Sequence, residues 1–355
     1  MGLMDLYFKK GKDSLIKKNI TCFRNDKGFQ CLSDNDAKLI AEELMSQFKK
    51  IEFKFKDGDG YYNREKYEEC PNKYKTPSEG SVLSNRDTFS ATLINNKWYT
   101  KCEDVLERMI KLAYKYRSEK KEVLENQISI PDTKNASRID LLRKDDETIE
   151  LIELKQWDNA NNPPTYAVAE CIKNLYMFIH LYWHLYIDQD GYKGDKIIKN
   201  FKIASEKKHI KIDDIYNIKD IKNIVLTILA PEKYYADYFE CSNKDILKKS
   251  FDTFCVILEK GVQEDLQKEL GKSYNIQIKL KTIENFDKDA YTQLINGIIN
   301  DYTITHKTKT VYSKRARGFT EQAEKISLVK YISDVKWFSD DMCNKLVNWE
   351  SYKLK

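Results

Sequence analysis

The sequence lacks several patterns that would point to familiar chemistries. Its eight cysteines include no CxxC pair, so neither a zinc ribbon nor an iron–sulfur cluster is expected. It has no G-x-x-x-x-G-K-[ST], G-x-S-x-G or G-x-G-x-x-G motif, so nothing predicts ATP use, and any ATP-driven motor would be a separate protein. No run approaches 18 apolar residues and no secretory signal peptide is present, which favours a cytoplasmic protein with reduced thiols and no membrane span.

Arginine is also scarce. Only nine of the 61 basic residues are arginines, and the formal net charge is +5. A lysine excess of this kind, with abundant asparagine and isoleucine, is more typical of an AT-rich genome than of selection for phosphate binding. The charge therefore permits a nucleic-acid partner without predicting one.

The apolar pattern predicts an α/β (α+β) chain in three regions. Residues 1–97 are expected to form an N-terminal accessory region, and residues 284–355 a helical C-terminal region. Within 98–283, periodicity and turn residues predict, in order, a helix (98–121), three strands (122–131, 136–145, 148–157) and a buried helix (165–188). A strand (221–231) that leads into a helix ending at 239, another helix (about 243–269) and a strand (275–283) follow. Hairpin-connected strands followed by a strand–helix–strand crossover predict a mixed sheet with helices on both faces.

Three charged residues lie within the apolar strands of SRIDLLRKDDETIELIELKQW. Asp140 is in one strand, and Glu153 and Lys155 are at the end of the next. Twelve residues separate Asp140 from Glu153, a spacing that places the two opposite each other in a hairpin. Lys155 is two positions beyond Glu153 and therefore points to the same side. Neighbouring carboxylates repel unless a cation lies between them, and Mg²⁺ or Mn²⁺ prefers such oxygens. A lysine alongside can orient or deprotonate a water, or stabilise charge on a phosphate.

This arrangement resembles the active site of the PD-(D/E)XK nucleases. The strand pair reads R-I-D-L-L and L-I-E-L-K-Q, and the order of elements over residues 98–283 is similar to the restriction-endonuclease-like core, including bacterial defence enzymes with an ELKQW motif. The resemblance implies a mixed-sheet core flanked by helices and a Mg²⁺- or Mn²⁺-dependent hydrolysis of DNA phosphodiester bonds. It also implies an endonuclease that serves restriction or anti-phage defence.

The resemblance also implies roles for particular residues. Asp140 and Glu153 would hold the metal, Lys155 would be the catalytic lysine, and Gln156 would support them. A literal Pro-Asp pair ends at Asp132, but that residue follows a strand-ending proline in a polar turn and is therefore not chosen. The helix after the strand pair has no Gln-x-x-x-Tyr motif, so the RecB-like branch is not indicated.

Members of this superfamily often add a glutamate from the first core helix. Glu103 fits as a further catalytic and metal-binding residue because apolar residues follow it on the buried side, at Leu106, Met109 and Ile110. Glu107, one turn later, is the second choice.

Several alternatives remain open at the level of sequence. The basic residues Lys314, Arg315 and Arg317 could follow a DNA backbone or lie in a solvated segment. The substrate could be RNA, the fold could serve a non-catalytic binding module, and the chain could form a homodimer. In the plainest interpretation, Glu153 and Lys155 are an exposed ion pair and Asp140 is unrelated to them.

Overall fold

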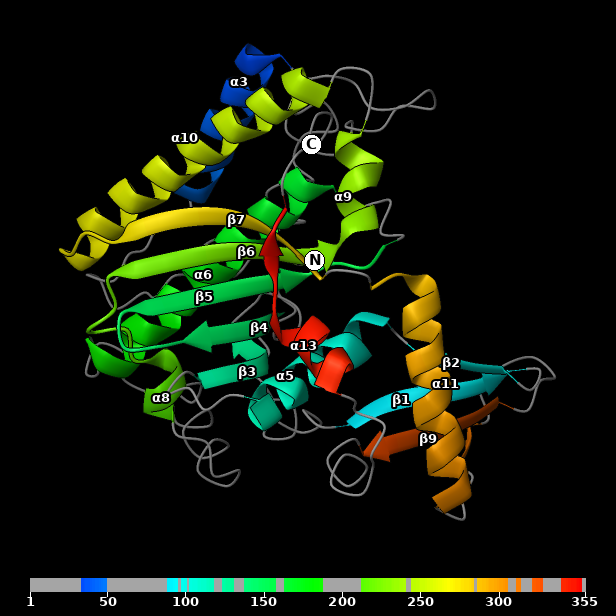
Figure 1. Ribbon diagram of the computed structural model, residues 1–355. Coiled ribbons are helices and arrows are strands. Elements are labelled where there is room, and N and C mark those ends of the chain that lie inside the picture. Colours follow the sequence, from blue (N-terminus) through cyan, green and yellow to red (C-terminus); the bar gives the residue numbers. More distant parts are fainter. Residues whose placement is uncertain are drawn as a thin grey trace.

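The computed structural model describes residues 33–49, 88–94, 97–100, 102–117, 123–130, 137–157, 163–187, 212–240, 244–283, 286–305, 311–313, 321–327 and 340–352. These residues form a mixed α/β structure with a six-stranded and a four-stranded sheet (Figure 1). Among the described helices, none combines the length and apolar character needed to cross a membrane.

The six-stranded sheet is mixed, as predicted. Its order is β10-β7-β6-β5-β4-β3. The strands are β3 (Val123–Ile130), β4 (Ser137–Lys144), β5 (Thr148–Leu154), β6 (Asn223–Pro231), β7 (Asn275–Ile283) and β10 (Glu350–Ser351). β3, β4 and β5 pair antiparallel, β5, β6 and β7 pair parallel, and β10 adds antiparallel to β7.

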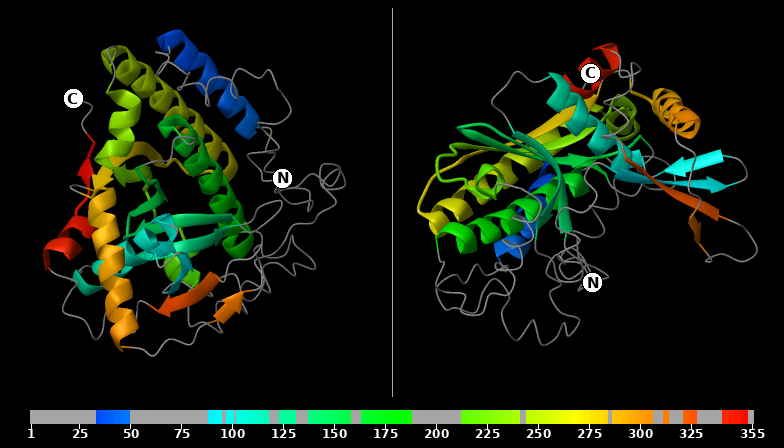
Figure 2. Two further views of the ribbon diagram at one scale, coloured as in Figure 1. Left: turned by 90° about the vertical axis from the view of Figure 1, so that its right-hand side faces the viewer. Right: turned by 90° about the horizontal axis from the view of Figure 1, so that it is seen from below.

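Helices cover both faces of this sheet, and each face has its own apolar core. The helices are α3 (Asp34–Lys49), α5 (Cys102–Arg117), α6 (Pro164–Tyr186), α8 (Ile212–Tyr216), α9 (Glu232–Phe239), α10 (Lys244–Leu270), α11 (Lys288–Thr305) and α13 (Asp340–Val347). One core joins α3, α6, α8, α9 and α10, and the other joins α5, α11 and α13. Figure 2 shows α6 and α10 on one side of the sheet, with α5 and α13 on the other.

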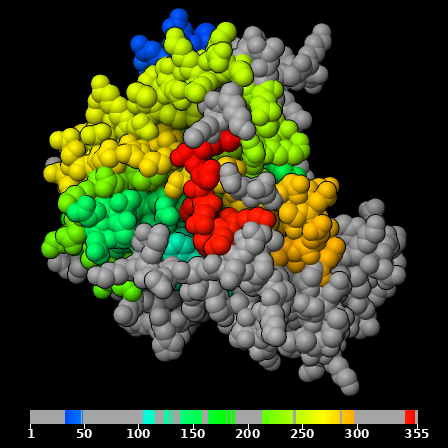
Figure 3. All heavy atoms as spheres, in the orientation of Figure 1, coloured from blue at the N-terminus to red at the C-terminus, as the bar shows by residue number. Residues whose placement is uncertain are grey.

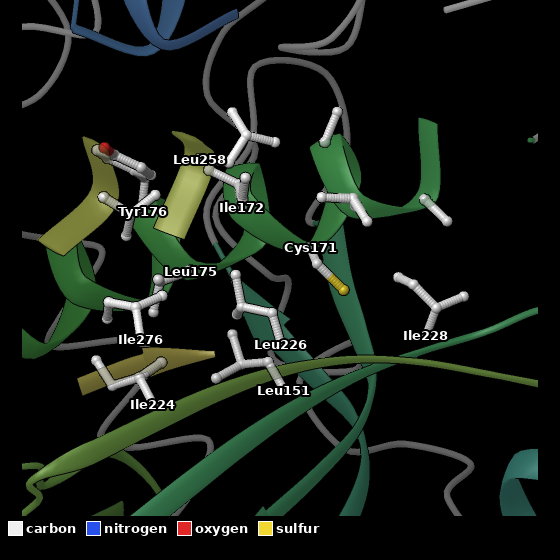
Figure 4. Packing of buried hydrophobic residues seen from close by; sticks show 14 of the residues in the cluster. Leu151, Cys171, Ile172, Leu175, Tyr176, Ile224, Leu226, Ile228, Leu258 and Ile276 are labelled. Atoms are coloured by element: carbon white, nitrogen blue, oxygen red, sulfur yellow. The ribbon is translucent and has the colours of Figure 1, made fainter. Parts of the chain in front are cut away.

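Helix α6 is the central element of the first core. It begins with Pro164, whose missing N–H is not needed in the first helical turn. Cys171, Ile172 and Leu175 pack onto strand residues such as Leu151 and Leu226 (Figure 4). Because nearly every side of α6 is buried, its few polar residues are held in fixed positions.

The four-stranded sheet joins segments that are far apart in the chain. Its strands are β1 (Thr88–Ile94), β2 (Lys97–Thr100), β8 (Val311–Ser313) and β9 (Glu321–Ser327), in the order β2-β1-β9-β8. Trp98 and Thr100 pair with β1, so the helix predicted from residue 98 begins only at Cys102. The C-terminal region, predicted to be helical, therefore also contains strands. Figure 3 shows its last described residues, coloured red, lying across the front of the molecule between α11 and the β7 side.

The β4–β5 hairpin positions the charged residues identified in the sequence. The side-chain oxygen Oδ1 of Asp145 accepts hydrogen bonds from the backbone N–H groups of Glu147 (2.9 Å) and Thr148 (2.6 Å), which closes the turn. Leu142 then pairs with Leu151 and Leu141 with Ile152. The pairing ends at Leu141 and Ile152, and the next residue of β4, Asp140, contacts the end of β5 through the backbone N–H of Leu154.

Candidate active site

Glu153 and Lys155 lie at the end of β5, where the parallel pairing with β6 stops. The backbone N–H of Lys155 donates to the carbonyl oxygen of Leu229 at 2.9 Å, which extends the pairing by one residue beyond Leu154. Lys155 is only 4% exposed and Glu153 5%. The Nζ of Lys155 donates to Oε1 of Glu153 at 2.5 Å. The two residues therefore form a buried ion pair, which differs from an exposed pair on a strand surface.

Asp140 joins this pair from β4. Its Oδ2 accepts a hydrogen bond from the backbone N–H of Leu154 at 2.8 Å, so its carboxylate is directed to the end of β5. Burial raises the pKa of Asp140 well above its usual value, and the carboxylate of Glu107 raises it further. Lys155 and the Leu154 N–H act in the opposite direction but do not offset this rise. Asp140 thus lies where a negative charge is costly.

Two residues of α6 complete the group, and the sequence analysis did not identify them. Glu170 lies with Oε2 at 3.4 Å from Nζ of Lys155. Asn174, one turn later, donates from Nδ2 to Oε2 of Glu153 at 3.4 Å. The available signal was a set of polar residues (Glu170, Lys173 and Asn174) inside a helix that is otherwise apolar on nearly every side.

Helix α5 supplies both of the glutamates considered from the sequence. Glu107 is almost fully buried, whereas Glu103 is partly exposed. Both raise the pKa of Asp140, and Glu107 has the larger effect. Glu103 also contributes to raising the pKa of Lys155. The structure thus brings both carboxylates toward the site and does not single out Glu103.

The remaining predicted residues are not brought into the group. Gln156 is half-buried and, within the described part of the chain, makes no hydrogen bond to Asp140, Glu153 or Lys155. Lys314, Arg315 and Arg317 lie outside the described residues.

The group as a whole carries an excess of negative charge. The pKa of Glu153 is raised well above its usual value by burial, then by the carboxylates of Asp140 and Glu170. Burial would lower the pKa of Lys155, but Glu153, Glu170 and Asp140 outweigh it and raise that pKa. The pKa of Glu170 is lowered, because Lys155 and Lys173 outweigh the effect of burial. Lys155 alone therefore does not balance Asp140 and Glu153.

This donor set fits a hard divalent cation that keeps much of its own water. Such a cation binds oxygen ligands, and Mg²⁺ commonly takes only one or two protein carboxylates. Asp140 and Glu153 supply two carboxylates whose mutual repulsion a cation would relieve. Within the described ranges, no three His, Cys, Asp or Glu residues form a ready-made metal-binding group. Asp140 and Glu153 could therefore hold Mg²⁺ or Mn²⁺ only if the ion kept most of its own water.

Comparison with known proteins gives no match for this chain. No protein-family model, no curated protein and no solved structure matches it. The functional interpretation therefore depends on the geometry of the site and on the motif that the sequence carries.

Proposed function

We propose that this protein is a Mg²⁺- or Mn²⁺-dependent nuclease of the PD-(D/E)XK type, with a restriction-endonuclease-like core, which hydrolyses phosphodiester bonds of DNA in restriction or anti-phage defence. One observation carries the proposal. Asp140, Glu153 and Lys155 meet at the end of the β4–β5 hairpin, and the two carboxylates are left without sufficient positive charge. This is the arrangement that the motif implies.

The residues of the site have distinct tasks in this proposal. Asp140 and Glu153 would hold the metal, and the carboxylate of Glu103 or Glu107, each of which acts on the pKa of Asp140, would favour a second ion. A bound metal supplies an activated water and neutralises charge on the phosphate. The carboxylates of Glu153, Glu170 and Asp140 raise the pKa of Lys155 in the metal-free protein. In this proposal Lys155 would orient or deprotonate a water, or donate a hydrogen bond to a phosphate oxygen.

A non-catalytic binding module is the competing proposal, and one observation favours it. Lys155 already contacts Glu153 and Glu170, so the group could be a closed ion pair whose only task is to hold β5 to α6. The two proposals differ in their response to a metal. A closed ion pair has no use for Mn²⁺, whereas a nuclease site needs it.

The proposal is tested by incubating the purified protein with plasmid, single-stranded DNA and RNA, with and without Mg²⁺ or Mn²⁺. We expect metal-dependent cleavage of DNA, and a loss of about 10²-fold to 10³-fold or more in Lys155→Ala and Asp140→Ala. The matched control is Lys222→Ala, since Lys222 forms an exposed ion pair with Glu147 beside the turn of the hairpin. That variant should cleave like the wild type.

Calorimetric titration with Mn²⁺ separates the remaining cases. Mn²⁺ binding that is lost in Asp140→Ala, without cleavage, would indicate a nuclease that needs a trigger. Cleavage of RNA alone would replace DNA as the substrate. Neither binding nor cleavage would leave the structural ion pair as the better explanation.

A further inference from the structure

We propose that Glu170 and Asn174 are positioning residues of the nuclease site: Glu170 retains Lys155 when a metal takes over Glu153, and Asn174 fixes the Glu153 carboxylate and receives a water of the site. This inference rests on the proposed function. It assigns to α6 a part in catalysis that the strand motif alone does not contain.

Glu170 is placed to share Lys155 with Glu153. Nζ of Lys155 is 2.5 Å from Oε1 of Glu153 and 3.4 Å from Oε2 of Glu170. A metal ion and an ammonium are both cations, so they compete for the same carboxylate of Glu153. Lys155 is buried and needs another acceptor once that oxygen is engaged. Glu170 supplies this acceptor, so the ammonium stays within the site.

Asn174 holds the other oxygen of the same carboxylate. Its Nδ2 donates to Oε2 of Glu153, while Lys155 donates to Oε1. With both oxygens held by different donors, the carboxylate of Glu153 cannot rotate freely. A metal ligand that is oriented by outer partners in this way binds more tightly than a mobile one.

The second oxygen of this amide indicates a further task. Oδ1 of Asn174 is buried and has no hydrogen-bond partner within the described structure. Buried carbonyl oxygens are rarely left without a donor, and a bound water is a common one. The oxygen belongs to a side chain that already contacts Glu153, so the water it would accept from lies beside the proposed metal ligand.

The position of both residues on one helix makes the arrangement rigid. Glu170 and Asn174 are four residues apart and therefore lie on one side of α6. Cys171, Ile172 and Leu175 between and beside them are embedded in the core, as Figure 4 shows. Polar groups on such an element keep their distances to the site better than groups on a loop.

The test combines steady-state DNA cleavage with Mn²⁺ titration of the full chain. In Glu170→Gln we expect kcat to fall by about tenfold to a hundredfold, with KM for DNA within about twofold and Mn²⁺ affinity within about threefold of the wild type. Glu170→Asp keeps the charge but changes the shape, and it should retain more activity than Glu170→Gln. A purely structural role would favour the better-shaped Gln instead.

In Asn174→Ala we expect Mn²⁺ affinity to fall by about tenfold. Asn174→Ser replaces it if thermal melting shows that the alanine variant is unfolded. The control is Thr282→Val on β7, which removes another buried oxygen without a partner but lies two strands from β5. This control should bind Mn²⁺ and cleave DNA like the wild type.

The possible failures are distinguishable. If the wild type binds Mn²⁺ and cleaves DNA while Glu170→Gln and Asn174→Ala behave like it, only this inference is overturned. A loss of Mn²⁺ affinity well above tenfold in Glu170→Gln would make Glu170 a ligand and overturn its positioning role. A wild type that neither binds Mn²⁺ nor cleaves overturns the proposed function, and this inference with it.

Discussion

Strand β5 carries two buried glutamates, three residues apart, in opposite electrostatic settings. Glu150 is 2% exposed and Glu153 is 5% exposed. Burial alone would raise the pKa of Glu150, but Arg143 and Lys281 outweigh it and lower that pKa. The pKa of Glu153 is instead raised by burial and by its acidic neighbours. Glu150 is thus paired with two cations on one face of the sheet, whereas Glu153, on the other face, shares a single cation, Lys155, with neighbouring carboxylates.

The cross-strand partner accounts for much of this difference. Arg143 stands opposite Glu150 in the β4–β5 register and forms an ion pair with it. Lys281 adds a second cation, whose Nζ lies 2.7 Å from Oε1 of Glu150. The centroid of the Trp349 ring lies 5.3 Å from the guanidinium carbon of Arg143 and 5.7 Å from Nζ of Lys281. Glu153 instead has the carboxylate of Asp140 nearby, and this charge raises its pKa. A buried carboxylate with two cations is a structural feature, whereas one that faces another carboxylate indicates a site for a cation.

The largest effect on stability should come from the ion-paired cluster of Glu150, Arg143 and Lys281. Glu150→Gln removes the charge that Arg143 and Lys281 share, so two cations are left with only a neutral partner. We expect the free energy of unfolding to fall by about 3 kcal/mol in urea titration. Lys222→Ala is the control, since it breaks only an exposed ion pair and should cost no more than about 1 kcal/mol. Similar losses in both variants would remove the contrast between the two glutamates.

Metal binding at Asp140 and Glu153 should stabilise the protein, and loss of the Glu150 charge should not change that gain. At a free Mn²⁺ concentration of about 100 times Kd, binding to the folded state alone adds about 2.7 kcal/mol to the free energy of unfolding. We expect this gain in the wild type and in Glu150→Gln, but not in Asp140→Ala. Thermal melting with and without Mn²⁺ measures it, and an equal gain in Asp140→Ala would place the metal elsewhere.

Removal of the charge of Asp140 should stabilise the metal-free protein. Asn in place of Asp140 can still accept the Leu154 N–H, but it carries no charge. Because the folded pKa of Asp140 is raised, its ionisation costs stability at neutral pH, and that cost disappears below the unfolded value of about 4. Asp140→Asn should therefore gain about 1 kcal/mol at pH 7.5 and nothing at pH 4. Urea titrations at the two pH values would show it, and a loss at pH 7.5 would contradict it.

The elements that could be predicted from the sequence depend on local patterns. The strand predicted over residues 275–283 is β7 with the same bounds, because apolar and polar residues alternate between clear turn signals. The start of α5 was wrong because Trp98–Thr100 pairs with β1, and β9 pairs with β1 across more than 200 residues of chain. Such long-range pairing leaves no local pattern to detect.

The same distinction applies to the candidate site. The proximity of Asp140 to Glu153 and Lys155 could be predicted because a hairpin is local and its spacing determines which residues come close. Glu170 and Asn174 stand out as polar residues in an apolar helix, but the periodicity of α6 does not reveal which of its sides meets β5, so the sequence alone does not place them at the site. The choice between Glu103 and Glu107 likewise depends on how α5 rotates against the sheet.

The turn closed by Asp145 sets the strand register, and this register positions the site at the other end of the hairpin. Insertion of a single residue there would shift the register by one and move Asp140 away from the backbone N–H of Leu154. In any descendant that keeps the contact between Asp140 and the end of β5, this exposed tip should therefore vary in its side chains but not in its length. Substitutions in the loop should be tolerated, provided that the register of β4 and β5 is kept.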